Sequence, residues 1–128
     1  MQKSILITGC SSGIGLDCAE TLHAMGWKVF ASCRKQADCD RLEAMGLTSP
    51  RLDHADADSI RDTIEQVKHA TGGTLDAVFN NGAFAVPGAV EDLPTDALRA
   101  IYETNVFGYH EVIRQVLPIM RAQGHGRI

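Results

Sequence analysis

The sequence has few of the features that mark secreted, metal-binding or nucleic-acid-binding proteins. Its 128 residues include only four cysteines and four prolines. The cysteines show no CxxC spacing and the histidines no metal-ligand spacing, so we expect reduced thiols and no bound metal. The formal net charge is −4, and no run of lysine and arginine occurs. This charge disfavours nucleic acid and anionic membranes as partners.

Long hydrophobic runs are missing as well. No segment approaches the roughly 20 apolar residues that cross a bilayer, and the N-terminus lacks the pattern of a secretory signal. We therefore expect a cytoplasmic protein. Hydrophobic residues make up 45% of the chain and charged residues 22%, which is typical of globular domains. The length suits one compact domain and not two.

Apolar segments with strand-like and helix-like patterns alternate along the chain. The predicted strands are 4–8, 28–33, 51–53 and 75–80, and the predicted helices are 13–25, 36–45, 58–71 and 95–123. Alternation of this kind predicts a doubly wound parallel sheet with helices on both faces. The last helix should place one set of residues on a single buried face, namely Val106, Tyr109, Ile113, Val116 and Met120. The final residues, 126–128, look like the start of a fifth strand.

A glycine-rich loop joins the first predicted strand to the first helix. Residues 8–15 read TGCSSGIG. Gly9 allows a sharp turn, Gly13 lets the backbone approach a pyrophosphate, and Gly15 lets the helix pack close to the sheet. The N–H groups and positive dipole end of the helix favour phosphate there. The alternative is an ordinary turn, but the position favours dinucleotide binding by the residues Gly9, Ser11, Ser12, Gly13, Ile14 and Gly15.

Together with later motifs, this loop resembles the short-chain dehydrogenase/reductase family over the whole chain. The later motifs are Asp53 after the third strand, the sequence NNGA at 80–83, the sequence NVFG at 105–108, and the ending GHGRI. The resemblance implies a Rossmann-type, three-layer α/β/α fold, truncated after the start of the fifth strand. Residues 1–128 would form a single NAD(P)-binding domain that is incomplete at its C-terminus. The family usually has NNAG where this chain has Gly82 before Ala83, which leaves the loop conformation open.

The residues after the second predicted strand indicate which cofactor is bound. A carboxylate at this position would accept from the ribose 2′-hydroxyl of NAD(H) and repel a 2′-phosphate. The chain has Cys33 there, followed by Arg34 and Lys35. An arginine can pair with phosphate through its planar fork of donors. NADP(H) is therefore predicted over NAD(H), although the two cations could simply be solvated.

The resemblance assigns further residues to the cofactor. It implies that Asp53 bonds the adenine amino group with His54 beside it. It also implies that Asn81, followed by Gly82 and Ala83, lies near the adenosine ribose. Asp56 is better explained as the N-cap of the next helix, which is a common role for aspartate near a helix start.

The resemblance also implies an NADP(H)-dependent enzyme that interconverts a small-molecule alcohol and a carbonyl by hydride transfer. Of the family's four catalytic residues, only the helix asparagine maps onto this chain, as Asn105. Tyr102 and Tyr109 are each followed four residues later by an aliphatic residue, so the chain has no YxxxK motif. We therefore expect a cofactor-binding half that is inactive alone.

Two points stay open at this level. The alternative to an enzyme half is a non-catalytic dinucleotide-binding or interaction module. The last helix could also provide a homo-oligomer contact, as similar helices do in the family. The sequence does not indicate the substrate.

Overall fold

Three short parallel strands form the centre of the molecule. The computed structural model describes all residues, Met1–Ile128. The strands β1 (Ser4–Ile7), β2 (Lys28–Ala31) and β3 (Ala77–Phe79) lie in the order β2-β1-β3. Ile5 is paired with Val29 on one side and with Ala77 on the other. A first strand between the second and a later one is the arrangement expected at the centre of a doubly wound sheet.

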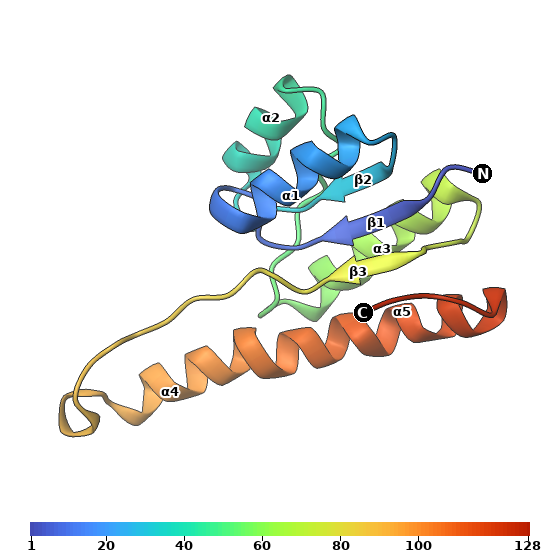
Figure 1. Ribbon diagram of the computed structural model, residues 1–128. Coiled ribbons are helices and arrows are strands. Elements are labelled where there is room, and N and C mark those ends of the chain that lie inside the picture. Colours follow the sequence, from blue (N-terminus) through green and yellow to red (C-terminus); the bar gives the residue numbers. More distant parts are fainter.

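Helices cover both faces of this sheet (Figure 1). The helices α1 (Gly13–Ala24) and α2 (Gln36–Ala44) lie on one face, and α3 (Ala57–Thr71) and α5 (Tyr109–Gln123) lie on the other. A short 3-10 helix at Val90–Asp92, η1, and the helix α4 (Thr95–Tyr102) precede α5. The predicted three-layer α/β/α architecture is confirmed. None of the helices combines the length and the apolar character that crossing a membrane requires.

Side chains of each strand alternate between two buried cores. Leu6 and Phe30 belong to the core under α3 and α5, and Val78 joins them there. Ile5 and Ile7 point into the core under α1 and α2. This alternation follows from the two-residue period of a strand. It explains why β1 reads as an uninterrupted apolar run, since helices bury both of its faces.

The predicted third strand is wrong as a regular element. The segment near β2 makes only isolated parallel bridges, between Phe30 and Thr48 and between Cys33 and Arg51. Pro50 lies between the two bridges and has no N–H to donate, so a continuous ladder cannot form. The chain still runs beside β2, and Leu52 N–H donates to the Cys33 carbonyl oxygen at 2.9 Å.

The end of the chain pairs with β3, as the sequence predicts for the start of a fifth strand. Arg127 forms a parallel bridge with Ala77. Arg127 N–H donates to the Asp76 carbonyl oxygen at 3.0 Å, and Val78 N–H donates to the Arg127 carbonyl oxygen at 2.8 Å. The sheet therefore extends beyond β3 on the side opposite β1.

The long C-terminal helix differs from the prediction in its middle. Residues Glu103–Gly108 form a π-helical segment, η2, between α4 and α5. A π-helical turn holds one more residue than an α-helical turn, so the buried face shifts along the sequence. Val106, predicted to be buried, is 46% exposed. The residues that are buried recur every four positions and are Gly108, Val112, Val116 and Met120.

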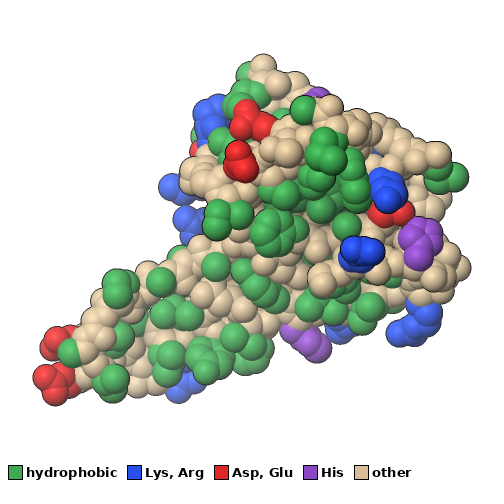
Figure 2. Space-filling model, viewed as in Figure 1, with side chains coloured by type: hydrophobic (Ala, Val, Ile, Leu, Met, Phe, Trp, Pro, Cys, Tyr) green, Lys and Arg blue, Asp and Glu red, His purple; other side chains and the backbone are tan.

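The α4 end of this helix extends past the sheet (Figure 1). Apolar side chains gather along this projecting part in the space-filling view (Figure 2). They include Leu98, Tyr102 and Phe107, which are about half exposed. The helix therefore carries an apolar surface that nothing in the chain covers.

Candidate functional site

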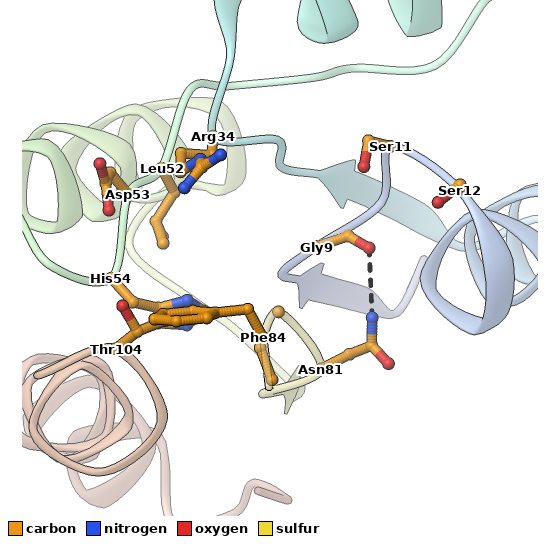
Figure 3. A pocket seen from close by; sticks show the side chains of 12 residues that line it. Gly9, Ser11, Ser12, Arg34, Leu52, Asp53, His54, Asn81, Phe84 and Thr104 are labelled. Atoms are coloured by element: carbon orange, nitrogen blue, oxygen red, sulfur yellow. Dashed lines mark hydrogen bonds between the residues drawn. The ribbon is translucent and has the colours of Figure 1, made fainter. Parts of the chain in front are cut away.

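A pocket of about 360 Å³ lies at the carboxyl ends of the strands (Figure 3). In open α/β sheets this edge is where ligands bind. Twelve residues line the pocket: Gly9, Ser11, Ser12, Arg34, Leu52, Asp53, His54, Asn81, Gly82, Ala83, Phe84 and Thr104. The structure thus brings together the glycine loop, the end of β2, the segment after Pro50 and the loop after β3.

Some of the predicted residues do not line the pocket. Gly13, Ile14 and Gly15 form the first turn of α1, and Ile14 is 72% exposed. Lys35 is the N-cap residue of α2, next to Arg34. Asn105 lies in the π-helical segment, beside the pocket-lining Thr104.

Two of the three glycines of the loop, Gly9 and Gly15, are required by close contacts. Gly9 has φ +70°, a left-handed conformation that glycine adopts readily. A Cβ on Gly9 would lie 2.4 Å from the Gly82 Cα, and a Cβ on Gly15 would lie 2.4 Å from the Gly9 carbonyl oxygen. Gly13 also has positive φ, and a Cβ there would meet nothing within 4 Å. These contacts agree with a sharp turn at Gly9, close packing at Gly15 and open space beside Gly13.

The sequence NNGA left the conformation of the loop at Gly82 open, and the structure now gives it. Gly82 is not among the positive-φ glycines. A Cβ on this residue would lie 3.0 Å from the His54 Cε1 and 3.1 Å from the Gly9 nitrogen. A small residue is therefore needed at position 82 because the glycine loop approaches closely, and not because of the backbone angle.

Asn81 and Thr8 fasten the two loops together. The Asn81 Nδ2 donates to the Thr8 carbonyl oxygen at 3.1 Å and to the Gly9 carbonyl oxygen at 3.2 Å. The Thr8 hydroxyl accepts from the backbone N–H groups of Asn81 and Gly82, both at 3.0 Å. The sequence prediction missed Thr8, although its place just before Gly9 is a usable signal. Asn81 thus lines the pocket while its amide donors hold the glycine loop.

The N-terminus of α1 has no side-chain cap, in contrast to that of α3. At α3, the Asp56 side chain accepts from the N–H groups of Asp58 and Ser59, as predicted. At α1, the N-cap residue Ser12 makes no capping hydrogen bond. The free N–H groups of a helix start attract an anion, particularly phosphate. The glycine-lined loop and this uncapped start together fit a dinucleotide.

The end of β2 carries no carboxylate. Cys33 is fully buried there, and burial raises the pKa of its thiol to about 11. Arg34 follows and lines the pocket. In Figure 3 its guanidinium lies on the same side of the pocket as Asp53, across from Ser11 and Ser12. Cys10, in the loop itself, is also fully buried, and burial raises the pKa of that thiol too.

His54 is a buried wall of the pocket with an unsatisfied nitrogen. Only 8% of the residue is exposed, and its ring centroid lies 5.1 Å from that of Tyr109. Burial lowers the pKa of His54, against the opposing influence of Asp53 and Asn80. The His54 Nε2 and the Asn80 Oδ1 are both buried without a hydrogen-bond partner.

Asn105 holds the loop that follows Ala83. Its Nδ2 donates to the Phe84 carbonyl oxygen at 2.8 Å, and its Oδ1 accepts from the Phe84 N–H at 3.3 Å. The Phe84 side chain extends toward His54 and Thr104 (Figure 3).

The sequence prediction named neither Phe84 nor Thr104 as pocket residues. It also missed Leu52, although the position of Leu52 next to Asp53 in the sequence could have indicated it.

The fold and this site define a dinucleotide-binding α/β protein. The family model for short chain dehydrogenases matches residues 3–128. The chain belongs to the short-chain dehydrogenase/reductase family of oxidoreductases.

Individual relatives agree with this assignment. The chain is 38% identical to the uncharacterized oxidoreductase YbbO of Escherichia coli K12, over 100% of this chain and 48% of the relative. It is 33% identical to the NADPH-dependent 1-acyldihydroxyacetone phosphate reductase of Schizosaccharomyces pombe, over 84% of this chain and 36% of that protein. The structure is similar to a short-chain dehydrogenase from Streptomyces avermitilis, with a TM-score of 0.90, 33% identity and coverage of 98% and 47% of the two chains. The chain spans about half the length of the curated relatives it matches.

Proposed function

We propose that this chain binds NADP(H) and forms the cofactor-binding half of an oxidoreductase that interconverts an alcohol and a carbonyl. The preference for NADP(H) over NAD(H) is based on one observation. Arg34 lines the pocket together with Ser11 and Ser12, while the residue at the end of β2 is the buried Cys33 in place of a carboxylate. A cation at this position, with no carboxylate at the end of β2, favours a 2′-phosphate over a 2′-hydroxyl.

Residues in and beside the pocket each have a proposed partner on the cofactor. The start of α1, with Gly13, Ile14 and Gly15, and the Ser12 hydroxyl would hold the pyrophosphate. Arg34, Lys35 and Ser11 would hold the 2′-phosphate. Asp53 and His54 would flank the adenine, and the 81–83 segment would lie along the adenosine ribose. The NADPH dependence in the name of the fission yeast relative supports this preference.

The chemistry of the whole protein is part of the proposal. When bound, the nicotinamide supplies or accepts a hydride at the carbonyl or alcohol carbon of a small-molecule substrate. Asn105 would contribute to the site by holding Phe84 and the loop after Ala83. The chain contains no YxxxK motif, because Tyr102 is followed by Val106 and Tyr109 by Ile113. We therefore propose that this chain binds cofactor without turnover.

The proposal also covers where the protein acts and whether it forms oligomers. The chain would act in the cytoplasm. The apolar surface of the projecting helix, with Leu98, Tyr102 and Phe107, would form a contact in a homo-oligomer, since exposed apolar patches usually mark interaction sites.

Calorimetric titration with NADPH and with NADH tests the cofactor assignment. We expect NADPH to bind at least about tenfold more tightly, as a charge-assisted phosphate contact implies. Arg34→Asp should abolish or invert that ratio, because the new carboxylate repels the phosphate and can accept from a 2′-hydroxyl. Arg99→Asp, on the exposed surface of α4, is the control for the change in net charge. Equal affinities in the parent protein, or a ratio unchanged by Arg34→Asp, would contradict the proposal.

The sequence leaves a second candidate open, a non-catalytic dinucleotide-binding or interaction module. The two candidates differ in what the coding sequence contains after Ile128. A serine-bearing strand followed by YxxxK supports the enzyme. A stop codon directly after Ile128 supports the module.

A further inference from the structure

Arg41 connects helix α2 to the glycine loop. Its Nη2 donates to the Ser11 carbonyl oxygen at 2.6 Å and lies 3.4 Å from the Asp38 Oδ1. Ser11 lines the pocket, whereas Arg41 does not. The contact therefore reaches the pocket through the backbone of the residue that lines it, across 30 positions of sequence.

We propose that Arg41 is a specificity-determining residue that positions Ser11 and adds positive charge for a phosphate on the adenosine 2′-oxygen. The proposal rests on the NADP(H) preference proposed above. It extends the phosphate-binding residues from the end of β2 to the middle of α2.

The donor pattern of Arg41 supports this role. Arginine has five N–H donors in a planar fork. Both contacts of Arg41 within the protein use Nη2, so the Nε and Nη1 donors have no protein partner. The side chain is 46% exposed, so a ligand can reach part of it. A guanidinium held by a backbone carbonyl is already ordered, which lowers the entropic cost of a further contact.

The charges around Arg41 predict whether each substitution raises or lowers the affinity for phosphate. Asp38 lies one turn before Arg41 and pairs with it. Without Arg41, this carboxylate would be uncompensated near Ser11 and would repel a phosphate. Asp40 is engaged elsewhere, because its Oδ1 accepts from the Gln36 side chain at 2.8 Å. Removing Arg41 and removing Asp38 should therefore change phosphate affinity in opposite directions.

Helix α3 provides a matched control. Arg61 pairs with Asp58 at the same three-residue spacing, 2.6 Å apart, and is 56% exposed. Arg61→Gln makes the same chemical change as Arg41→Gln in a similar setting, but Arg61 contacts no part of the glycine loop.

The experiment compares two small probes on the purified protein, 2′,5′-ADP and 5′-AMP, which differ only in the 2′-phosphate. Arg41→Gln should weaken 2′,5′-ADP binding about tenfold, as expected for one lost charge-assisted contact, and change 5′-AMP binding by less than about twofold. Asp38→Asn should strengthen 2′,5′-ADP binding, and Arg61→Gln should leave both probes unchanged. Circular dichroism melts check folding, and Arg41→Lys, which keeps the charge without the fork, serves if Arg41→Gln does not fold.

Two results would overturn the inference, and they differ in meaning. If the parent protein prefers 2′,5′-ADP and Arg41→Gln keeps that preference, or weakens both probes equally, Arg41 only stabilises the loop and the NADP(H) proposal stands. If the parent binds both probes equally, the NADP(H) proposal fails and the specificity role of Arg41 fails with it.

Discussion

The Asn81 side chain holds Gly9 in its turn, because the Asn81 Nδ2 donates to the Gly9 carbonyl oxygen at 3.2 Å. The same nitrogen donates to the Thr8 carbonyl oxygen at 3.1 Å. Two carbonyl groups at the end of β1 thus depend on one amide from the loop after β3. The shape of the glycine loop is therefore set by a tertiary contact as well as by its own glycines.

Replacing Asn81 should destabilise the protein and weaken NADPH binding together. Asn81→Ala leaves two carbonyl groups without a donor and should lower the free energy of unfolding by about 1–3 kcal/mol. Asn81→Asp should cost more, since a carboxylate would then face two carbonyl oxygens. Urea denaturation and NADPH titration measure the two effects. Thr8→Ser, which keeps the hydroxyl acceptor, is the control, and an Asn81→Asp protein as stable as the parent would contradict this account.

Gly15→Ala should reverse the usual effect of this substitution in a helix. Alanine in place of glycine within a helix normally stabilises it by about 1 kcal/mol. At Gly15, however, the added Cβ would lie 2.4 Å from the Gly9 carbonyl oxygen and 2.7 Å from the Asn81 Nδ2. Overpacking of this kind costs about 1–3 kcal/mol, so thermal melting should show net destabilisation. A Gly15→Ala protein that melts above the parent would refute the close contact.

The local parts of the site could be predicted from the sequence. Gly9, Gly15 and Asp56 are explained by the turn or helix start in which they lie, and the motif spacing identifies those elements. The contacts of Asn81 with Thr8 join residues 73 apart, and no pattern within either segment specifies them. The role of Asn81 in holding the loop was missed for that reason.

The π-helical segment and the broken third strand could not be predicted for a similar reason. A Cβ on Gly108 would lie 2.5 Å from the His54 carbonyl oxygen, so the π segment ends where the helix backbone passes close to a distant loop. Periodicity counts only neighbours in sequence, and it placed Val106 on the wrong face. Pro50 was visible in the sequence, but its position between the two bridges to β2 depends on the strand register.

The buried cysteines should react slowly with alkylating agents. Cys10, Cys33 and Cys39 are fully buried, whereas Cys18 is half-buried. Burial raises the pKa of Cys33 to about 11, so little of the reactive thiolate exists at pH 8. Iodoacetamide labelling of the native protein, followed by peptide mass analysis, should find Cys18 modified first. Cys18→Ser should leave the native protein nearly unlabelled, and early modification of Cys33 would contradict the buried position.

Asp76 should make the protein more sensitive to acid. Burial tends to raise the pKa of Asp76, but hydrogen bonds from the Ser4 backbone N–H, the His125 ring and the Ser4 hydroxyl outweigh it, and the pKa is lowered. The resulting stabilisation is present above the ordinary aspartate pKa, near 4, and is lost as the pH falls through the lowered value. When unfolding is measured from pH 6 to pH 2.5, the free energy of unfolding should fall less steeply with acid in Asp76→Asn than in the parent protein. Asp92 is an exposed residue of η1, and Asp92→Asn is the control that should keep the pH dependence of the parent protein. Equal pH dependence in the two variants would show that Asp76 does not cause the acid sensitivity.

His54 should affect the free energy of unfolding at a higher pH than Asp76 does. Asp76 stabilises the protein in its charged form, whereas His54 does so in its neutral form. Burial is the main cause of its lowered pKa, and Asp53 and Asn80 oppose the shift. A histidine whose folded pKa lies below the unfolded value stabilises the protein only while it is neutral. Its contribution is complete above pH 6.5 and is lost as the pH falls below that value, by at most about 1.4 kcal/mol per pH unit for one proton. An NMR titration of the His54 ring should give a pKa below the ordinary histidine value, which is about 6.5.

The stability slope between pH 7 and pH 5 separates His54 from the other histidines. His54→Gln should flatten this slope, because glutamine takes up no proton. His23→Gln, at an exposed position of α1, should leave the slope unchanged. The Nε2 of His54 has no hydrogen-bond partner, and burial is the main factor that disfavours protonation of the ring. If His54→Gln kept the full slope, the loss of stability between pH 7 and pH 5 would have to come from another group.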